Sequence, residues 1–158
     1  MSQFIRSLFG PALLLLSAAC LAQGTPAAAQ PTYDPALAAS LGADDRGMRS
    51  YVLVILKSGA VGVPAGPERD AMFQGHFANI DRLSKAGKLV YAGPLDGVDG
   101  WRGLYVFAVA DIDEARQLVA TDPVVVKGEM VAEYHRHDGS AALMLAPATH
   151  ERLVKPRR

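Results

Sequence analysis

Cysteine is nearly absent from this chain, which has one such residue, Cys20, among 158. A single cysteine excludes an intramolecular disulfide and any site built on several thiolates. The fold must therefore be held by an apolar core, for which a hydrophobic content of 50% is ample. The length leaves room for one domain of ordinary size once terminal extensions are set aside.

Excess charge, phosphate-binding loops and long apolar runs are also lacking. Basic and acidic side chains number 16 each, and the basic run is confined to the tail 155–158. This excludes the electrostatic footprint of a nucleic-acid-binding protein. The sequence has no glycine-rich phosphate loop and no serine nucleophile elbow, and we expect no cofactor. The apolar stretch 8–19 is too short for a stable membrane span.

Residues 1–22 have the features of an export signal peptide. Arg6 supplies the positive charge, residues 8–19 form the apolar core, and small residues follow. Cleavage after Ala22, or as late as residue 29, would remove the cysteine and give a periplasmic or secreted product.

An alternative is a membrane-anchored lipoprotein. The sequence Leu-Ser-Ala-Ala-Cys resembles the lipobox of bacterial lipoproteins, in which the lipidated cysteine becomes the first mature residue. Here Ser17 stands where an aliphatic residue is usual, three positions before Cys20. Both routes of export remain open at this point.

Composition divides the remaining chain into a linker, a folded domain and a tail. Residues 23–49 are rich in Ala, Gly, Pro and Gln, which is typical of a flexible linker, with a short turn of helix expected over 36–41. We expect the folded domain over 50–146 and a tail over 147–158. Periodicity and turn signals predict, in order, strand 51–56, helix 67–86, strand 88–95, a turn whose tip carries Trp101, strand 104–109, helix 111–122, strand 129–137 and a short fifth strand 141–145.

The order β-α-β-β-α-β is that of the ferredoxin-like α+β fold, in which both helices cover one face of a four-stranded antiparallel sheet. Strands 51–56 and 104–109 are apolar on both sides, so a monomer would expose an apolar sheet face. We therefore expect a homodimer packed face to face around a barrel-like core.

One histidine is expected on the buried side of helix 67–86. At about 100° per residue, His76 projects between Ile80 and Leu83. A polar ring in an apolar stripe requires a hydrogen-bonding partner or a chemical role. From the residues alone, a core histidine satisfied by a nearby carboxylate or carbonyl is the simpler interpretation.

Several residues in combination resemble the YCII-related (YciI-like) family over about 51–133. They are Arg69 and His76 in the first helix, the sequence Ala86-Gly-Lys-Leu-Val-Tyr-Ala-Gly-Pro-Leu95, and Asp122-Pro123 with Gly128 after the second helix. The resemblance implies a dimeric ferredoxin-like α+β barrel with an active-site cleft in which His76 meets Asp122.

The resemblance also implies a type of chemistry. At least one protein resembling this fold is a dehydrochlorinase of a chlorinated hydroxyhydroquinone, which implies lyase-like or hydrolase-like activity here. The chain departs from most relatives in its leader sequence and in Val124, where an aromatic residue is common after Asp-Pro. Because of Val124, the substrate of those relatives is not carried over to this chain.

A histidine paired with a carboxylate is suited to general acid/base catalysis. The carboxylate fixes the imidazole tautomer, raises the basicity of the ring and leaves the second nitrogen free to move a proton. We expect His76 and Asp122 to act in elimination or hydrolysis of a small aromatic or anionic molecule. The alternative is a non-catalytic ligand-binding or interaction module that uses the same cleft.

Five further residues are candidates for binding that molecule. Arg69 lies two helical turns before His76, about 10 Å along the axis, and is suited to an anionic group. Tyr91 and Trp101 are candidate aromatic walls, while Gly93 and Pro94 close the strand beneath the cleft. The structural alternatives are a surface cation for Arg69, a core residue for Tyr91 and a dimer contact for Trp101.

A separate cluster of potential metal ligands lies in strand 129–137. The two-residue period of a strand places Glu133, His135 and His137 on one face, a geometry suited to zinc or a related metal. A solvated strand end is the simpler interpretation. A metal-binding protein is therefore a second alternative function.

Overall fold

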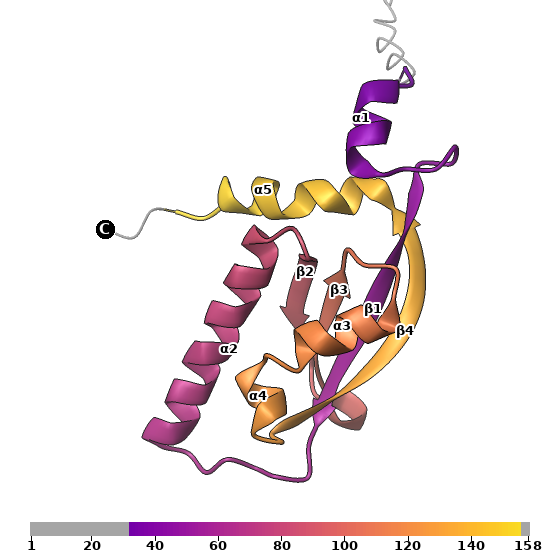
Figure 1. Cartoon of the computed structure of the whole chain (residues 1–158). Coiled ribbons are helices and arrows are strands. Elements are labelled where there is room, and N and C mark those ends of the chain that lie inside the picture. The colour runs from indigo at the N-terminus through magenta and orange to yellow at the C-terminus, as the bar shows by residue number, and fades with distance from the viewer. Residues whose placement is uncertain (1–31, 156–158) are drawn as a thin grey trace, which may run out of the picture. The chain divides into compact units, whose positions relative to one another are not determined.

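The computed structural model describes residues 32–155, so the expected export signal and lipobox lie outside the described part of the chain. Strands and helices follow one another along these residues as Figure 1 shows. Their bounds are α1 (Pro35–Leu41), β1 (Met48–Ser58), α2 (Pro67–Lys85), β2 (Leu89–Pro94), the 3₁₀ turn η1 (Val98–Gly100), β3 (Trp101–Phe107), α3 (Ile112–Val119), α4 (Pro123–Val126), β4 (Met130–Ser140), the 3₁₀ helix η2 (Ala141–Leu145) and α5 (Ala146–Glu151).

The four strands form one sheet in the order β2-β3-β1-β4, and every neighbouring pair is antiparallel. Helices α2 and α3 lie on the same side of this sheet (Figure 1). This arrangement confirms the ferredoxin-like α+β fold. The connection from β3 through α3 and α4 to β4 carries Asp122 to the side of the sheet that α2 covers.

The main core lies between the helices and one face of the sheet. Alternate residues of β1, namely Val52, Val54 and Leu56, point into it because side chains alternate between the two faces of a strand. Met72 and Leu83 of α2 pack against them, together with Tyr105, Phe107, Ala115 and Val119. Burial of these apolar side chains fixes the register of α2, and with it the position of His76.

The opposite face of the sheet is partly covered by the chain itself. Tyr51, Val90 and Val106 are buried there, with Leu143 and Met144 of η2 packed against them. The prediction of a fifth strand over 141–145 was wrong, because this segment is a 3₁₀ helix. The Ser140 hydroxyl accepts a hydrogen bond from the backbone N–H of Ala142 and so caps the helix.

Exposed apolar residues remain on the part of that face that η2 leaves open. Lys57 of β1 pairs with Trp101 of β3 on one side and with Val131 of β4 on the other. The side chains of Trp101 and Val131 therefore lie on the same face of the sheet. Both are exposed, as is Tyr91 on the edge strand β2. The apolar surface expected from the sequence is therefore smaller than the whole sheet face.

Two segments differ locally from the prediction. Within the expected linker, the short turn of helix expected over 36–41 is extended to the helix α1 over 35–41, where the Asp34 side chain accepts a hydrogen bond from the backbone N–H of Leu37. Trp101 is the first residue of β3 rather than the tip of a turn, because η1 completes the turn at Gly100. Strand β1 begins at Met48, where it pairs with Ser140 of the long strand β4.

Helix α2 ends where the sequence predicts. Pro67 occupies its first turn, where a missing N–H is harmless, and Gly87 after its last residue has a φ of 68°.

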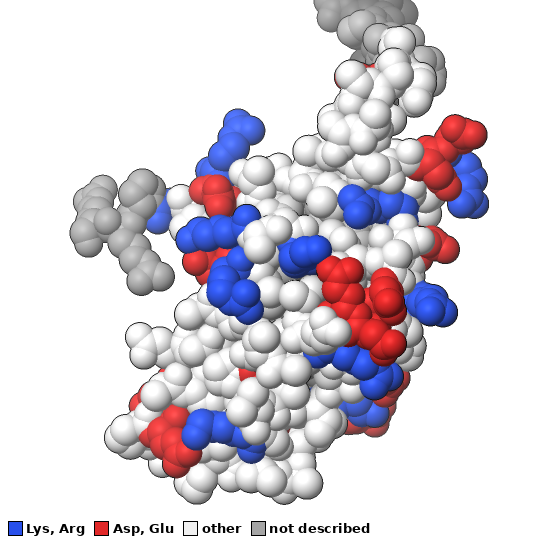
Figure 2. Space-filling model, in the orientation of Figure 1, with Lys and Arg blue, Asp and Glu red and all other residues white. Residues whose placement is uncertain are grey.

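None of the helices in residues 32–155 is long and apolar enough to cross a membrane. On the face shown in Figure 2, acidic and basic side chains are interspersed and no large area of one sign is seen.

Candidate functional site

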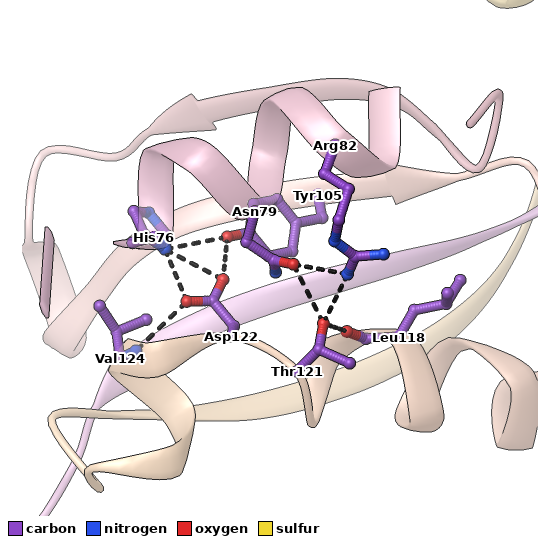
Figure 3. A network of polar contacts seen from close by, with 8 residues as sticks. All are labelled: His76, Asn79, Arg82, Tyr105, Leu118, Thr121, Asp122 and Val124. Atoms are coloured by element: carbon purple, nitrogen blue, oxygen red, sulfur yellow. Dashed lines mark hydrogen bonds and ion pairs between the residues drawn. The ribbon is translucent and has the colours of Figure 1, made fainter. Parts of the chain in front are cut away.

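His76 and Asp122 are in direct contact inside the core (Figure 3). His76 is 8% exposed and Asp122 is fully buried. The Nδ1 atom of His76 lies 2.9 Å from Oδ1 and 3.0 Å from Oδ2 of Asp122. Since an ionised carboxylate only accepts hydrogen bonds, Nδ1 carries the hydrogen and the lone pair of a neutral ring is on Nε2. The predicted contact between the two residues is confirmed.

Tyr105 of β3 is a third member of this cluster. Its hydroxyl donates a 2.6 Å hydrogen bond to Oδ2 of Asp122 and lies 3.3 Å from Nδ1 of His76. Burial, and secondly the hydrogen bond to Asp122, raise the pKa of the Tyr105 hydroxyl well above its usual range. Tyr105 therefore stays protonated and acts as a permanent donor to the carboxylate.

The position of Asp122 is fixed by its own backbone turn. Asp122 is the N-cap of α4, and its Oδ1 accepts a 3.2 Å hydrogen bond from the backbone N–H of Val124. Three donors, from His76, Tyr105 and Val124, thus converge on one carboxylate. This satisfies a buried charge that would otherwise be costly.

Contacts between α2 and the Asp122 turn hold the two elements together. The side-chain oxygen of Asn79 accepts hydrogen bonds from Arg82 at 2.7 Å and from the Thr121 hydroxyl at 3.1 Å (Figure 3). Next to His76, Gly75 lets the turn approach closely, because a Cβ atom there would lie 3.0 Å from Cγ of Pro123. Both features keep the carboxylate within reach of the imidazole.

His76 lines a cavity of about 550 Å³ between α2 and the helix-covered side of the sheet. No hydrogen bond to its Nε2 atom is found among residues 32–155, whereas Nδ1 is held by Asp122. The cavity is open to solvent, and Phe77 in its lining is 63% exposed. Its lining is mostly apolar and consists of Leu56, Phe73, His76, Phe77, Ile80, Ala92, Gly93, Pro94, Leu95, Arg102, Gly103, Leu104, Tyr105 and Met130.

Two of the five predicted binding residues, Gly93 and Pro94, line this cavity. The structure places the other three elsewhere. Tyr91 lines a second hollow between β2 and α5, and the 42% exposed Trp101 lies outside the cavity lining. The guanidinium group of Arg69 is also outside it, because the group is held by other protein atoms.

Those atoms belong to an ion pair at the start of α2, in which Arg69 is half-buried and Glu129 is buried. Nη2 of Arg69 lies 2.7 Å from Oε1 of Glu129, and its Nη1 donates a hydrogen bond to the carbonyl of Val63. The hydrogen bond from Arg69, followed by that from the Val63 N–H, lowers the pKa of the Glu129 carboxyl. In this arrangement Arg69 ties the loop before α2 to the strand end that carries Glu129.

The three candidate metal ligands of β4 take part in other contacts. Nε2 of His135 lies 2.8 Å from Oε1 of Glu133, which also pairs with Lys57, and the ring of His137 packs near that of Tyr51. Within residues 32–155, no group of three histidine, cysteine, aspartate or glutamate side chains is arranged to hold a metal ion.

Tyr105, Arg102 and Gly75 were missed by sequence reasoning. A tyrosine hydroxyl in the otherwise apolar strand 104–109, and a glycine in the middle of a helix beside His76, were available as signals. Neither identifies its partner, because the contacts with Asp122 and Pro123 depend on how distant elements pack.

The fold is that of a ferredoxin-like α+β protein, and it holds a buried histidine–carboxylate pair beside an open cavity. The family model of the YCII-related domain matches residues 48–135, more than half of the chain, and the chain belongs to this family. A search of curated proteins finds no match. Among solved structures, the chain is similar to a 5-chloro-2-hydroxyhydroquinone dehydrochlorinase from Burkholderia phenoliruptrix AC1100 in complex with 2,5-dihydroxybenzoquinone, with 19% identity, 55% of this chain and 90% of that chain covered, and a TM-score of 0.38.

Proposed function

We propose that this protein is an enzyme in which His76 acts as a general base on a small molecule bound in the cavity. One observation carries the proposal: His76 is held at Nδ1 by a buried carboxylate while the ring lines an open cavity of about 550 Å³. A cavity of this size suits a small organic ligand. The free nitrogen is the one that would accept a proton.

The chemistry that fits is elimination or hydrolysis that starts with removal of a proton. When Nε2 accepts the proton, the imidazolium that forms is stabilised by Asp122, which lies 2.9 Å from Nδ1. Asp122 acts through His76 and is a positioning residue. Tyr105 keeps the carboxylate oriented through its 2.6 Å hydrogen bond.

Proton abstraction is testable without knowledge of the product. The protein is incubated in deuterium oxide with a panel of phenols, hydroquinones, 2-oxo acids and halogenated acids, and NMR follows deuterium exchange and halide release. We expect at least one compound to react faster than in buffer, with the gain lost in His76→Gln. His135→Gln is the matched control, because His135 is exposed and lies on strand β4, away from the cavity lining. Equal rates for wild type and His76→Gln throughout the panel would contradict the proposal.

A non-catalytic ligand-binding module is the second candidate, favoured by the largely apolar lining of the cavity. It predicts compounds that raise the thermal unfolding temperature, and that lose affinity in His76→Gln, without exchange or turnover in the deuterium assay. The same panel therefore separates the two functions.

We further propose that the protein forms a homodimer through the face of the sheet opposite α2 and α3. The exposed side chains of Tyr91, Trp101 and Val131 on this face support the proposal. Apolar surface left exposed on one face of a sheet commonly marks an interface. Light scattering at micromolar concentration is expected to give twice the chain mass, and Val131→Glu to give the monomer. A wild-type monomer would contradict the dimer.

We also propose export by way of residues 1–22, with lipidation at Cys20 as the alternative. The full-length chain is expressed in a bacterial host, and the fractions are examined by mass spectrometry. Export predicts a periplasmic chain that begins after Ala22 or as late as residue 29. The lipoprotein alternative predicts a membrane-bound chain whose anchoring is lost in Cys20→Ala.

A further inference from the structure

Arg102 is the cationic side chain in the cavity lining. It lies at the start of β3, and its side chain is 33% exposed. Its closest carboxylate oxygen is Oε1 of Glu129, 3.8 Å from Nη1, which is too long for a hydrogen bond. Within residues 32–155, no acceptor for the guanidinium N–H groups of Arg102 is found.

Glu129 is already occupied by stronger partners. Its Oε1 atom lies 2.7 Å from Nη2 of Arg69, and its Oε2 atom accepts a 2.8 Å hydrogen bond from the backbone N–H of Val63. Hydrogen bonds from Arg69 and from the Val63 N–H therefore take up both oxygens of this carboxylate, and Arg102 adds only a longer-range attraction at 3.8 Å. The guanidinium group of Arg102 has no hydrogen-bonded carboxylate partner, and Arg102 lines the cavity, whose lining includes no carboxylate.

The remaining lining is suited to an apolar body. Phe73, Phe77 and Ile80 of α2 face Ala92 and Pro94 of β2 across the cavity. Arg102 and Tyr105 are three residues apart on β3, about 10 Å at the rise of a strand, and Tyr105 touches His76. A ligand of the length of one substituted ring can therefore reach from the guanidinium group to the imidazole.

We propose that Arg102 binds the carboxylate of the substrate and so places the apolar part of the molecule against His76. The substrate class is an apolar, ring-sized monocarboxylate, held by the paired N–H donors that make arginine suited to a planar oxyanion. This inference rests on the proposed function, which makes His76 the base that meets the reacting end of the substrate. Arg69, the cation predicted for this role, instead forms an ion pair with Glu129.

A pair of probes that differ in one group, a carboxylate or the neutral amide of similar shape, tests the inference. The dissociation constants of 4-ethylbenzoate and 4-ethylbenzamide are measured by NMR on the imidazole resonance of His76, which is assigned by its loss in His76→Gln. We expect 4-ethylbenzoate, below called benzoate, to bind about tenfold more tightly than 4-ethylbenzamide, below called benzamide. Arg102→Gln is expected to abolish this preference and to leave the benzamide affinity within about twofold. Arg136→Gln, which removes an exposed arginine from β4, should change neither value.

Equal benzoate affinity in wild type and Arg102→Gln, or no binding of either probe up to its solubility limit, would overturn the inference. Should Arg102→Gln not fold, Arg102→Lys carries the test, because it keeps the charge without the planar pair of donors. It is then expected to weaken benzoate severalfold and to leave benzamide unchanged, and unchanged benzoate binding in Arg102→Lys would overturn the inference. Arg102-dependent binding without proton exchange in the deuterium assay would contradict the proposed function and leave the carboxylate site in place.

Discussion

Tyr105 and Asp122 are joined by a 2.6 Å hydrogen bond in the interior of the protein, between the central part of β3 and the turn before α4. The bond matters because the same carboxylate also accepts from His76. With Tyr105 fixed on Oδ2 and the Val124 N–H on Oδ1, Asp122 has little freedom to rotate. The imidazole is therefore held in a single orientation, with its second nitrogen available to the cavity.

The first prediction concerns the tautomer of neutral His76. Because Asp122 accepts the hydrogen bond from Nδ1, the ring should carry its hydrogen on Nδ1 and not on Nε2. In Asp122→Asn, the amide group offers a donor to Nδ1 and should shift the population toward the Nε2–H form. Side-chain ¹⁵N chemical shifts distinguish the two tautomers. A wild-type ring protonated mainly on Nε2 would refute the proposed orientation of the base.

The second prediction concerns the stability supplied by the Tyr105 hydroxyl. Tyr105→Phe keeps the buried ring and leaves Oδ2 of Asp122 without its short hydrogen bond. We expect the free energy of unfolding to fall by about 1–3 kcal/mol, the usual cost of a buried polar atom without its partner. Urea denaturation measures the change.

Tyr134→Phe is the matched control for this variant. Tyr134 is a partly buried tyrosine of the same sheet, packed under Arg116, and no hydrogen bond of its hydroxyl is found within residues 32–155. Its loss should change the free energy of unfolding by less than about 0.5 kcal/mol. Equal effects of the two variants would show that the bond to Asp122 contributes nothing specific.

The third prediction concerns acid stability. The hydrogen bond from Arg69 lowers the pKa of Glu129 in the folded state. The unfolded chain therefore takes up this proton first, at about pH 4.3. The ionised carboxylate stabilises the fold above that pH, and the contribution is lost as the pH falls through the folded pKa. Glu129→Gln should be less stable than wild type at pH 7 and should lose less stability between pH 7 and pH 3.

Glu114→Gln is the control for this titration, because it removes an exposed carboxylate that pairs with Lys88. Chemical denaturation at a series of pH values should show that the free energy of unfolding of this variant changes with pH as steeply as that of wild type. A wild-type slope in Glu129→Gln as well would mean that the acid sensitivity of the fold arises from other carboxylates.

Much of the fold is encoded in local patterns. The strand and helix periods, Pro67 at the start of α2 and the left-handed Gly87 at its end place the elements in the right order. The fifth strand failed because an apolar run of five residues, 141–145, has no period that separates a strand from a short helix. The cap by Ser140 and Pro147 in the next turn favour the helix.

The site was only partly accessible to the same reasoning. The burial of His76 follows from helix periodicity, and its contact with Asp122 was implied by the family resemblance. Arg102 was not predicted because it lies where the pairing of β1 with β3 shifts register, between Leu56 and Lys57. Such a bulge redirects side chains in a way that strict alternation does not anticipate.

The last prediction concerns Gly75, which precedes His76 on α2. A glycine inside a helix is usually destabilising, and its replacement by alanine commonly adds about 0.5–1 kcal/mol of stability. Here the new Cβ atom would lie 3.0 Å from Cγ of Pro123, so the turn that carries Asp122 must move outward. We expect Gly75→Ala to lack the usual gain in stability and to lengthen the hydrogen bond between His76 and Asp122.

Urea denaturation and the ¹⁵N shifts of His76 measure the two effects. Ala78→Gly, at an exposed position of the same helix, is the control and should lose about 1 kcal/mol, which sets the size of the ordinary helix contribution. If Gly75→Ala is stabilised by that amount while His76 keeps its wild-type shifts, close approach of the Asp122 turn does not depend on glycine. A loss of the Nδ1–H tautomer without loss of folding would instead show that Gly75 is present for the geometry of the site and not for the helix.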